Sequence, residues 1–294
     1  MRSRLVAALA FALVLGPAWS ARAEGFTISA TLRNAAYHLP DAPDVMVHAP
    51  ADFDPRAKLD LVVYLHGYSG CLGVLMGDGP SRCRPSDPPQ TGWNLGARHD
   101  DAKTNTLLIV PQLAFMKQSG RPGAFRKPGV FRAFLTELLG ETLVPQLGGP
   151  RTLADVASLT LVAHSAGYET ALAVLEHGEV AQWVHALVLL DALYGEEERY
   201  ERFILAHAGK GSGRLRVVAL HLGYGATQAN DLRLHRRLLR VFGPRQVAWV
   251  EPATLEASLA THALVIGTGV GPHRQVPEHH LAQILRALAV PLRP

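Results

Sequence analysis

Hydrophobic residues in this chain gather in short continuous runs separated by stretches of mixed character. Runs rich in Leu and Val are typical of strands that are buried on both faces of a parallel sheet. They lie at 60–66, 106–111, 158–162, 183–191 and 215–222, with shorter runs at 247–250 and 262–267. The segments 26–32 and 44–48 instead alternate apolar and polar residues. This alternation predicts half-buried antiparallel strands at one edge of the sheet.

Between the runs, apolar residues recur at helical spacing. Such stretches lie at 93–102, 130–147, 166–175, 196–208, 232–241 and 277–288, the last with Pro277 at its first position. Strands that alternate with helices along the chain predict an α/β fold, with a mostly parallel central sheet flanked by helices on both faces. Two segments rich in Gly, Pro and Arg, 68–105 and 112–127, are expected to be largely irregular. No repeat or linker divides the chain.

The run at 158–162 leads into Ser165, and the residues after it have helical character. A serine at a sharp turn from strand to helix is typical of a nucleophile elbow, which needs small residues beside the serine. Ala163 and Gly167 meet this need, although the motif Ala-His-Ser-Ala-Gly departs from the strict Gly-x-Ser-x-Gly at its first position. The alternative is a serine that only caps the helix.

The N-terminus predicts export. Two arginines precede an apolar run at 5–15, and the residues Ala-Arg-Ala at 21–23 form a small-x-small cleavage site. This is the pattern of a secretory signal peptide over residues 1–23, and its apolar run is too short to remain as a membrane anchor. We therefore expect a mature chain of 24–294 that forms a single domain in the periplasm or outside the cell.

The composition and net charge of the chain bear on its fold class and on whether it binds nucleic acid. The whole chain is 48% hydrophobic, which fits one α/β domain with a sizeable core. Its formal net charge is +4, and the signal peptide holds three arginines and no acidic residue, which leaves +1 on the mature chain. A near-neutral chain without a basic run gives no reason to expect a nucleic-acid partner.

The chain contains two cysteines, Cys71 and Cys83, both in the irregular segment 68–105. Exported proteins meet an oxidising environment, and no group of metal ligands stands beside these cysteines in the sequence. We therefore expect a local disulfide; the alternative is a pair of free thiols.

Taken in order, these features resemble the α/β-hydrolase fold family, of the serine esterase and lipase type. A buried strand ends in His66-Gly67, the elbow lies at Ser165, a later strand ends in Asp191, and His273 precedes the last helix. The resemblance covers nearly the whole mature chain. It implies a catalytic triad of Ser, Asp and His in that chain order.

Several histidines could complete the triad. His273 lies in the loop from which this family supplies its histidine, and it is our choice. His164 lies beside the serine, and His262 would lie at the far end of a strand. His279 and His280 fall within the last helix, where we expect them to be solvent-exposed.

Two carboxylates compete for the third place. Asp191 lies at the carboxyl end of a strand, which is the edge where catalytic groups collect in open sheets. Asp231 lies beyond the next strand, where many relatives in this family carry their acid, and we expect it at a solvent-exposed helix start. We prefer Asp191 and keep Asp231 as the alternative.

The chemistry also requires donors for the oxyanion. The resemblance implies the backbone N–H of Ala166 and that of Gly67 or Tyr68. We expect His66 to be a buried supporting residue that does not react.

The expected function is that of an exported serine hydrolase that cleaves a small or lipid-like carboxylic ester through an acyl-enzyme. An amidase, peptidase or thioesterase with the same triad is one alternative, and a non-catalytic binding protein of the same fold is another. We expect no metal ion or organic cofactor, since the HExxH and CxxC signatures are absent from the sequence. We also expect no nucleic-acid partner and no stable membrane anchor. The sequence leaves the oligomeric state open.

Overall fold

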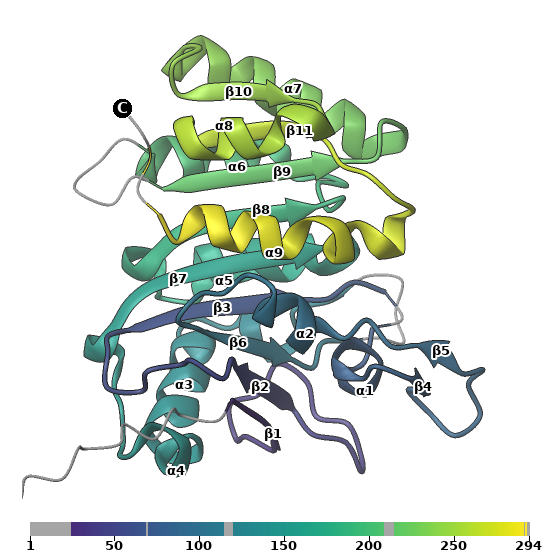
Figure 1. Cartoon of the computed structure of the whole chain (residues 1–294), viewed down its shortest axis with the longest axis vertical. Coiled ribbons are helices and arrows are strands. Elements are labelled where there is room, and N and C mark those ends of the chain that lie inside the picture. Colours follow the sequence, from purple (N-terminus) through teal and green to yellow (C-terminus); the bar gives the residue numbers. More distant parts are fainter. Residues whose placement is uncertain (1–24, 69, 115–119, 209–214, 291, 293–294) are drawn as a thin grey trace, which may run out of the picture.

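The computed structural model describes residues 25–68, 70–114, 120–208, 215–290 and 292 (Figure 1). The predicted signal peptide at 1–23 lies outside the described residues. In the part of the chain that is described, no helix combines the length and the hydropathy needed to cross a membrane.

A single large sheet organises the molecule, with strand order β1-β2-β6-β3-β7-β8-β9-β11-β10. Its strands are β1 (Phe26–Ala30), β2 (Val45–Ala49), β3 (Leu59–Leu65), β6 (Thr106–Pro111), β7 (Val156–His164), β8 (Val184–Leu190), β9 (Arg216–His221), β10 (Val247–Val250) and β11 (Leu264–Thr268). β2 pairs antiparallel with both β1 and β6, and the remaining neighbours are parallel. The predicted antiparallel start and parallel remainder are therefore confirmed.

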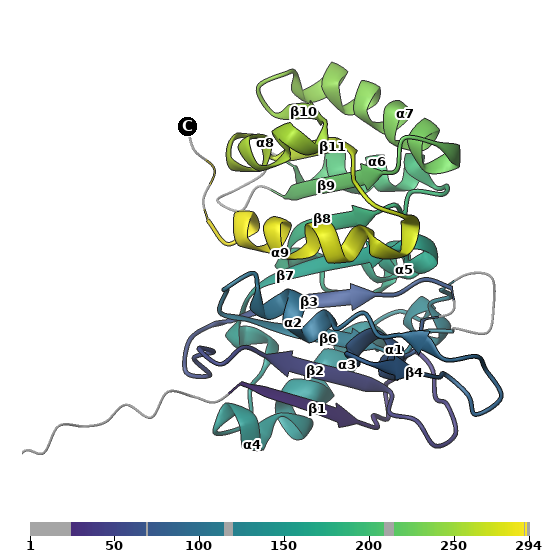
Figure 2. The ribbon, with the colours of Figure 1, turned by 45° about the vertical axis from the view of Figure 1, so that its right-hand side comes forward.

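Helices cover both faces of this sheet (Figures 1 and 2). In front of it in Figure 1 lie α1 (Leu72–Met76), α2 (Leu95–Asp100), α8 (Leu255–Thr261) and α9 (Val276–Leu288). Behind it lie α3 (Val130–Glu137), α4 (Val144–Leu147), α5 (Tyr168–His177), α6 (Glu197–His207) and α7 (Gly225–Phe242). The α/β fold with helices on both faces follows the prediction.

The strand residues show why both faces are covered. Successive side chains of β3 point to opposite faces, so Leu61 and Val63 join one apolar core and Val62 and Tyr64 join the other. All four are fully or almost fully buried. Each large apolar side chain contributes roughly 2 kcal/mol when it is buried. A charged residue at Val63 would therefore break the packing of α5 and its neighbours on the sheet.

Some elements differ from their prediction. The stretch 130–147 is not one helix, since a π-helical turn at Leu138–Thr142 separates α3 from α4. α7 begins at Gly225, well before the predicted start at 232. Three elements have no counterpart among those predicted from the sequence: α1, α8 and the small hairpin formed by β4 (Pro80–Ser81) and β5 (Gln90–Thr91).

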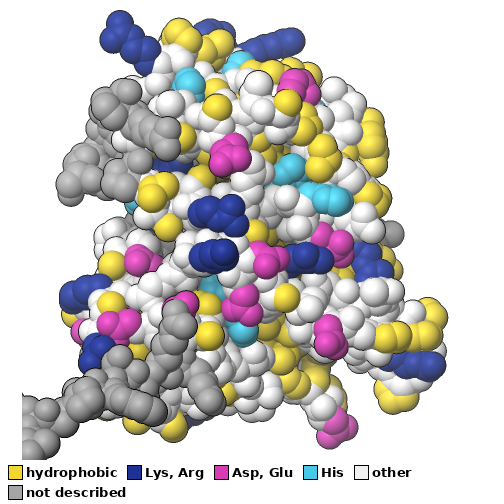
Figure 3. All heavy atoms as spheres, in the orientation of Figure 1, with side chains coloured by type: hydrophobic (Ala, Val, Ile, Leu, Met, Phe, Trp, Pro, Cys, Tyr) yellow, Lys and Arg dark blue, Asp and Glu magenta, His cyan; other side chains and the backbone are white. Residues whose placement is uncertain are grey.

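The predicted disulfide between Cys71 and Cys83 is present, with their Cα atoms 5.6 Å apart. It closes a loop that contains α1 and β4, the first strand of the hairpin. The predicted irregular segment 68–105 therefore contains a loop that the disulfide closes and a short hairpin. On the molecular face shown in Figure 3, basic and acidic side chains lie interspersed.

Candidate active site

The residue Ser165 stands where β7 ends and a short 3-10 turn leads into α5. Its backbone has φ 56°, a left-handed conformation that non-glycine residues rarely adopt. Two glycines make room for this turn. A Cβ on Gly167 would lie 2.1 Å from the carbonyl oxygen of Leu65, and one on Gly67 would lie 2.6 Å from the Cβ of Ser165. The sharp, crowded turn has the form of a nucleophile elbow.

A chain of hydrogen bonds connects three of the predicted site residues. The Nε2 atom of His273 lies 2.8 Å from Ser165 Oγ, and its Nδ1 atom lies 2.5 Å from Asp191 Oδ2. Asp191 accepts the Nδ1 proton, which leaves the Nε2 lone pair facing the serine hydroxyl. This tautomer is the one that a general base needs in order to take a proton from serine. These bonds bring together residues that are 108 and 82 positions apart in the sequence.

The environment of Asp191 keeps its carboxylate charged. It lies directly after β8, is 4% exposed and has φ 44°. Burial alone would raise the pKa of Asp191, but hydrogen bonds from His273 and from Thr227, whose Oγ1 donates over 2.6 Å, outweigh burial and lower it. A buried carboxylate with both oxygens bonded is well placed to stabilise a neighbouring imidazolium.

The expectation that Asp231 lies at a solvent-exposed helix start is wrong. Asp231 is 2% exposed and lies inside α7, one helical turn beyond Thr227. Burial, helped by the negative charge of Asp191, raises its pKa well above the usual value. The raised pKa favours the protonated, neutral form of the Asp231 carboxyl, and in this structure it is Asp191 that is bonded to His273.

His164 is hydrogen-bonded to the main chain of the loop that carries His273. The Nε2–H group of His164 donates to the main-chain oxygen of His273 over 2.9 Å, and the two rings lie 4.8 Å apart. Burial, followed by the nearby His273 ring, lowers the pKa of His164 to about 3, so this ring is neutral. Trp93 packs edge-on against His164 at 5.1 Å. The histidine that precedes the serine is therefore a support.

Trp93 also contacts Arg274, the residue after His273, whose guanidinium lies 5.6 Å from the indole ring. The same guanidinium donates to the main-chain oxygen of Thr91 in β5. The segment that follows the disulfide loop, at Thr91 and Trp93, therefore contacts the loop of His273 through one side chain, that of Arg274. Sequence analysis missed this role of Trp93, because it depends on residues about 180 positions apart.

The predicted oxyanion donors flank the elbow. A Cβ on Gly67 would lie 3.0 Å from the backbone nitrogen of Ala166, so the two main-chain segments approach closely there. His66 is fully buried, as expected, and burial lowers its pKa to about 4. Its Nε2 accepts from Leu113 N over 2.9 Å, and its Nδ1 donates to the oxygen of Gly67. His66 therefore anchors the end of β3. Tyr68 is 56% exposed.

Tyr194 is a site residue that the sequence analysis did not identify. It lies three positions after Asp191, and its ring stands edge-on to His273 at 6.3 Å. Burial and the charge of Asp191 raise the pKa of Tyr194 to about 12, although a hydrogen bond with Ser165 acts in the opposite direction. The phenol is therefore protonated at neutral pH and lies beside the serine. Its short distance in sequence from Asp191 is the signal that could have found it.

The other candidate histidines lie outside the relay. His262 ends α8 before β11, at the opposite end of that strand, as expected. His279 is exposed, but His280 is only 3% exposed, so the expectation of a solvated His280 is wrong. Its Nε2 accepts from Val270 N over 2.9 Å. His280 lies four residues after Val276 and four before Ile284, which are both buried, and this spacing could have revealed its position.

No family model and no curated protein sequence matches this chain. Solved structures do match in fold. The feruloyl esterase module from Clostridium thermocellum, in complex with sinapinate, matches with TM-score 0.55 and 12% identity over 90% of this chain and 88% of its own. A protein named FAE matches with TM-score 0.52 and 12% identity over 91% and 90%. An esterase from Pyrobaculum calidifontis has TM-score 0.46 and 11% identity over 90% and 82%.

At these identities the likeness concerns the course of the main chain. The first two matches extend over nearly the full length of both chains. The sheet order, the two helical layers and the elbow after β7 agree with it. This chain therefore has the α/β-hydrolase fold.

Proposed function

We propose that this chain is an exported serine hydrolase that cleaves carboxylic esters through an acyl-enzyme. The observation that carries the proposal is the continuous relay from Ser165 through His273 to Asp191. A serine hydroxyl is a weak nucleophile until a neutral imidazole accepts its proton, and the imidazole needs a carboxylate to fix its tautomer. The likeness in fold to a feruloyl esterase module supports an ester as the substrate class.

In the proposed reaction, Ser165 Oγ attacks the ester carbonyl while its proton passes to His273 Nε2. Asp191 stabilises the imidazolium that forms. The N–H of Ala166, together with that of Gly67 or Tyr68, donates to the oxyanion. His273 then gives the proton to the departing alcohol, and water, activated by the same imidazole, releases the acid from Ser165.

The oxyanion donors are proposed because the main chain at Gly67 and the nitrogen of Ala166 lie close together beside the serine. Each donor contributes about 10² to 10³ in kcat in enzymes of this type. The absence of a side chain at Gly67 allows this close approach, since a Cβ there would lie 2.6 Å from Ser165 Cβ.

Export is part of the proposal, and the disulfide supports it. Structural disulfides persist in oxidising compartments and are rare in the cytosol. The Cys71–Cys83 bond therefore fits a periplasmic or extracellular protein.

The test uses the chain 24–294, purified with its disulfide intact. We expect hydrolysis of p-nitrophenyl esters, and labelling by a fluorophosphonate probe at a single residue, Ser165, identified by mass spectrometry. Labelling at another residue, or equal labelling of a Ser165→Ala variant, would contradict the proposal. Hydrolysis of p-nitroanilides or thioesters at a higher kcat/KM than esters would favour an amidase or a thioesterase. A folded chain that neither turns over nor is labelled would be a binding protein.

A further inference from the structure

Two histidines and an aspartate meet where α2 packs on the antiparallel edge of the sheet. His48 projects from β2, while His99 and Asp100 end α2. One ring nitrogen of each histidine and one carboxylate oxygen all lie within 4.8 Å of one another. The two rings stand edge to face, 5.7 Å apart. None of these three residues belongs to the relay at Ser165 or to its supports.

Each histidine is held on one side by a threonine from a neighbouring strand. His48 Nδ1 lies 2.8 Å from Thr27 Oγ1 on β1, and His99 Nε2 lies 2.6 Å from Thr106 Oγ1 on β6. Metal-binding histidines characteristically use one ring nitrogen for the metal and the other for a hydrogen bond that fixes the ring. The two threonines provide that second kind of contact.

The remaining nitrogens are the ones that an ion would use. His99 is fully buried, and its Nδ1 atom has no hydrogen-bond partner among the described residues. Buried polar atoms are almost always bonded, so an unbonded nitrogen inside a protein points to a ligand. The Nε2 atom of His48 lies 2.9 Å from Asp100 Oδ1, its only hydrogen-bond partner within the described part of the chain.

Access and charge also suit a cation. The side chain of Asp100 is 48% exposed and that of His48 is 12% exposed. Asp100 lines an open groove of about 680 Å³ together with Asp52, Lys103 and Asn105. An ion and its water ligand can therefore reach Asp100 from solvent, while His48 and the fully buried His99 lie behind the lining of this groove.

We propose that His48, His99 and Asp100 form a zinc-binding site, with water as the fourth ligand. Two imidazole nitrogens and one carboxylate oxygen are a ligand set that Zn²⁺ accepts, at about 2.0 to 2.2 Å from the metal. Tetrahedral binding at those lengths requires ligand atoms roughly 3.4 Å apart. His48 Nε2 and Asp100 Oδ1 are already 2.9 Å apart, so the exposed Asp100 side chain must move outward slightly, and the histidine rings must turn so that their nitrogens reach this spacing. Zn²⁺ takes the place of the proton between His48 Nε2 and Asp100, and water carries that proton to His48 Nδ1, where it is donated to Thr27 Oγ1, so the imidazole stays neutral.

The bound ion would join β2 to α2, with β1 and β6 held through the threonines. Its role is to fasten this edge of the fold, and it takes no part in the reaction at Ser165. The proposal is therefore independent of the proposed esterase function, and a Ser165→Ala protein should bind zinc as well as the parent does.

The experiment titrates ZnCl₂ into the chelator-treated chain 24–294, against a competing chromophoric chelator, and follows the Tm in parallel. We expect one site per chain and a Tm that rises with zinc concentration. Mg²⁺ and Ca²⁺ should produce neither effect, because these ions prefer oxygen ligands.

Asp100→Asn and His48→Gln should each weaken binding at least about 100-fold, and Thr106→Val should weaken it about 10-fold by releasing the His99 ring. Asp101→Asn and His279→Gln are matched controls, since both residues are exposed neighbours of buried histidines, and their affinity should equal that of the parent. A dissociation constant weaker than about 100 µM would overturn the proposal. So would zinc binding that Asp100→Asn and His48→Gln leave unchanged, because the metal would then be held by other histidines.

Discussion

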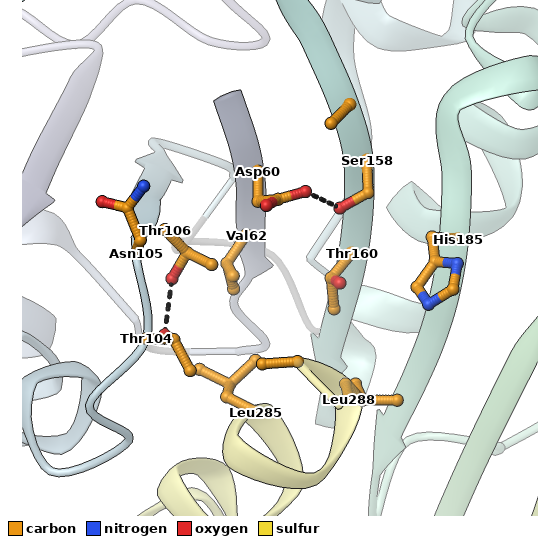
Figure 4. Close-up of a pocket in the computed structure, with 12 residues that line it drawn as sticks. Asp60, Val62, Thr104, Asn105, Thr106, Ser158, Thr160, His185, Leu285 and Leu288 are labelled. Carbon is orange, nitrogen blue, oxygen red and sulfur yellow. Dashed lines mark hydrogen bonds between the residues drawn. The ribbon is translucent and has the colours of Figure 1, made fainter. Parts of the chain in front are cut away.

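The two ends of the central sheet carry the same kinds of side chain in different arrangements. At the amino ends of the strands, Asp60, Ser158 and His185 line a hollow of about 400 Å³ (Figure 4). There Ser158 donates directly to Asp60 over 2.5 Å, and no side chain of the described residues is hydrogen-bonded to the His185 ring. At the carboxyl ends, His273 stands between Ser165 and Asp191. Only in this second arrangement does an imidazole lie between the serine and the carboxylate.

The backbone differs as much as the side chains do. Ser158 lies within β7, where the N–H groups of its neighbours belong to the sheet. Ser165 lies just past the strand in a left-handed conformation, and the N–H of Ala166 follows in the turn. Residue types alone therefore do not define a site. In the proposed mechanism the elbow supplies both the attacking hydroxyl and an oxyanion donor, and a serine within the strand would supply neither.

The largest effect should separate the two serines. We expect Ser165→Ala to lower kcat by about 10⁶, as loss of the nucleophile does in serine proteases. Ser158→Ala should leave kcat unchanged, because its hydroxyl only bonds Asp60. Ester hydrolysis by both variants, with circular dichroism as the check on folding, measures the difference. A strong loss in Ser158→Ala alone would reverse our assignment of the two ends.

The second contrast concerns the carboxylates. Asp191→Asn presents an amide donor where His273 needs an acceptor, and it should lower kcat by about 10⁴. Asp60→Asn keeps an oxygen to accept from Ser158 and should have little effect on kcat. Asp231→Asn should also retain activity. If Asp231→Asn were inactive and Asp191→Asn active, the third member of the triad would be wrongly assigned, while the relay at Ser165 and His273 would stand.

A smaller effect should follow from opening the disulfide. The double variant Cys71→Ser with Cys83→Ser should lose about 3 kcal/mol of unfolding free energy in the chain-entropy model. The double variant should also lower kcat by a larger factor than it raises KM, because Trp93 then holds His164 and the His273 loop less firmly. Denaturant unfolding and steady-state kinetics test the two effects. Titration of the denatured, unreduced parent should find no free thiol.

The smallest effect should depend on pH. Because burial raises the pKa of Asp231 above its usual value of 3.8, the native state keeps a proton that the unfolded chain releases. Stability therefore falls as pH rises from about 4 toward the raised pKa. Asp231→Asn removes this penalty, so its unfolding free energy should match the parent near pH 3 and exceed it progressively toward neutral pH. A constant difference at all pH values would contradict a protonated Asp231.

Sequence reasoning worked best where a residue's surroundings follow from its own neighbours. The buried strands could be predicted because a short continuous apolar run between polar turns fits few structures besides a strand covered on both faces. The order of Ser165, Asp191 and His273 was implied by the resemblance to the α/β-hydrolase family, which rests on the residues at the ends of those strands. Prediction failed where the pattern was weak. The first turns of α7, from Gly225, lack apolar periodicity, so its start was placed too late and Asp231 was expected to be exposed. In 130–147, Gly140 and Pro145 mark the place where the helix breaks.

Contacts between distant segments could not be predicted. Nothing near Thr227 in the sequence indicates that its hydroxyl bonds Asp191, and nothing near Trp93 indicates His164. Such contacts depend on how α7 and the segment after the disulfide loop pack against the sheet. Packing of that kind involves residues that share no local pattern.

The left-handed backbone at both Ser165 and Asp191 also bears on how such a chain would change over generations. Each of these residues holds a conformation that costs of order 1 to 2 kcal/mol, which glycine would adopt freely. Selection for stability alone would therefore favour glycine at these two positions, and the proposed catalysis would be lost with the Ser165 and Asp191 side chains. A descendant that kept the fold only to bind a ligand would be free to make both exchanges. Glycine after β7 and after β8 would then indicate that an ancestor of such a protein had the activity and that it was lost.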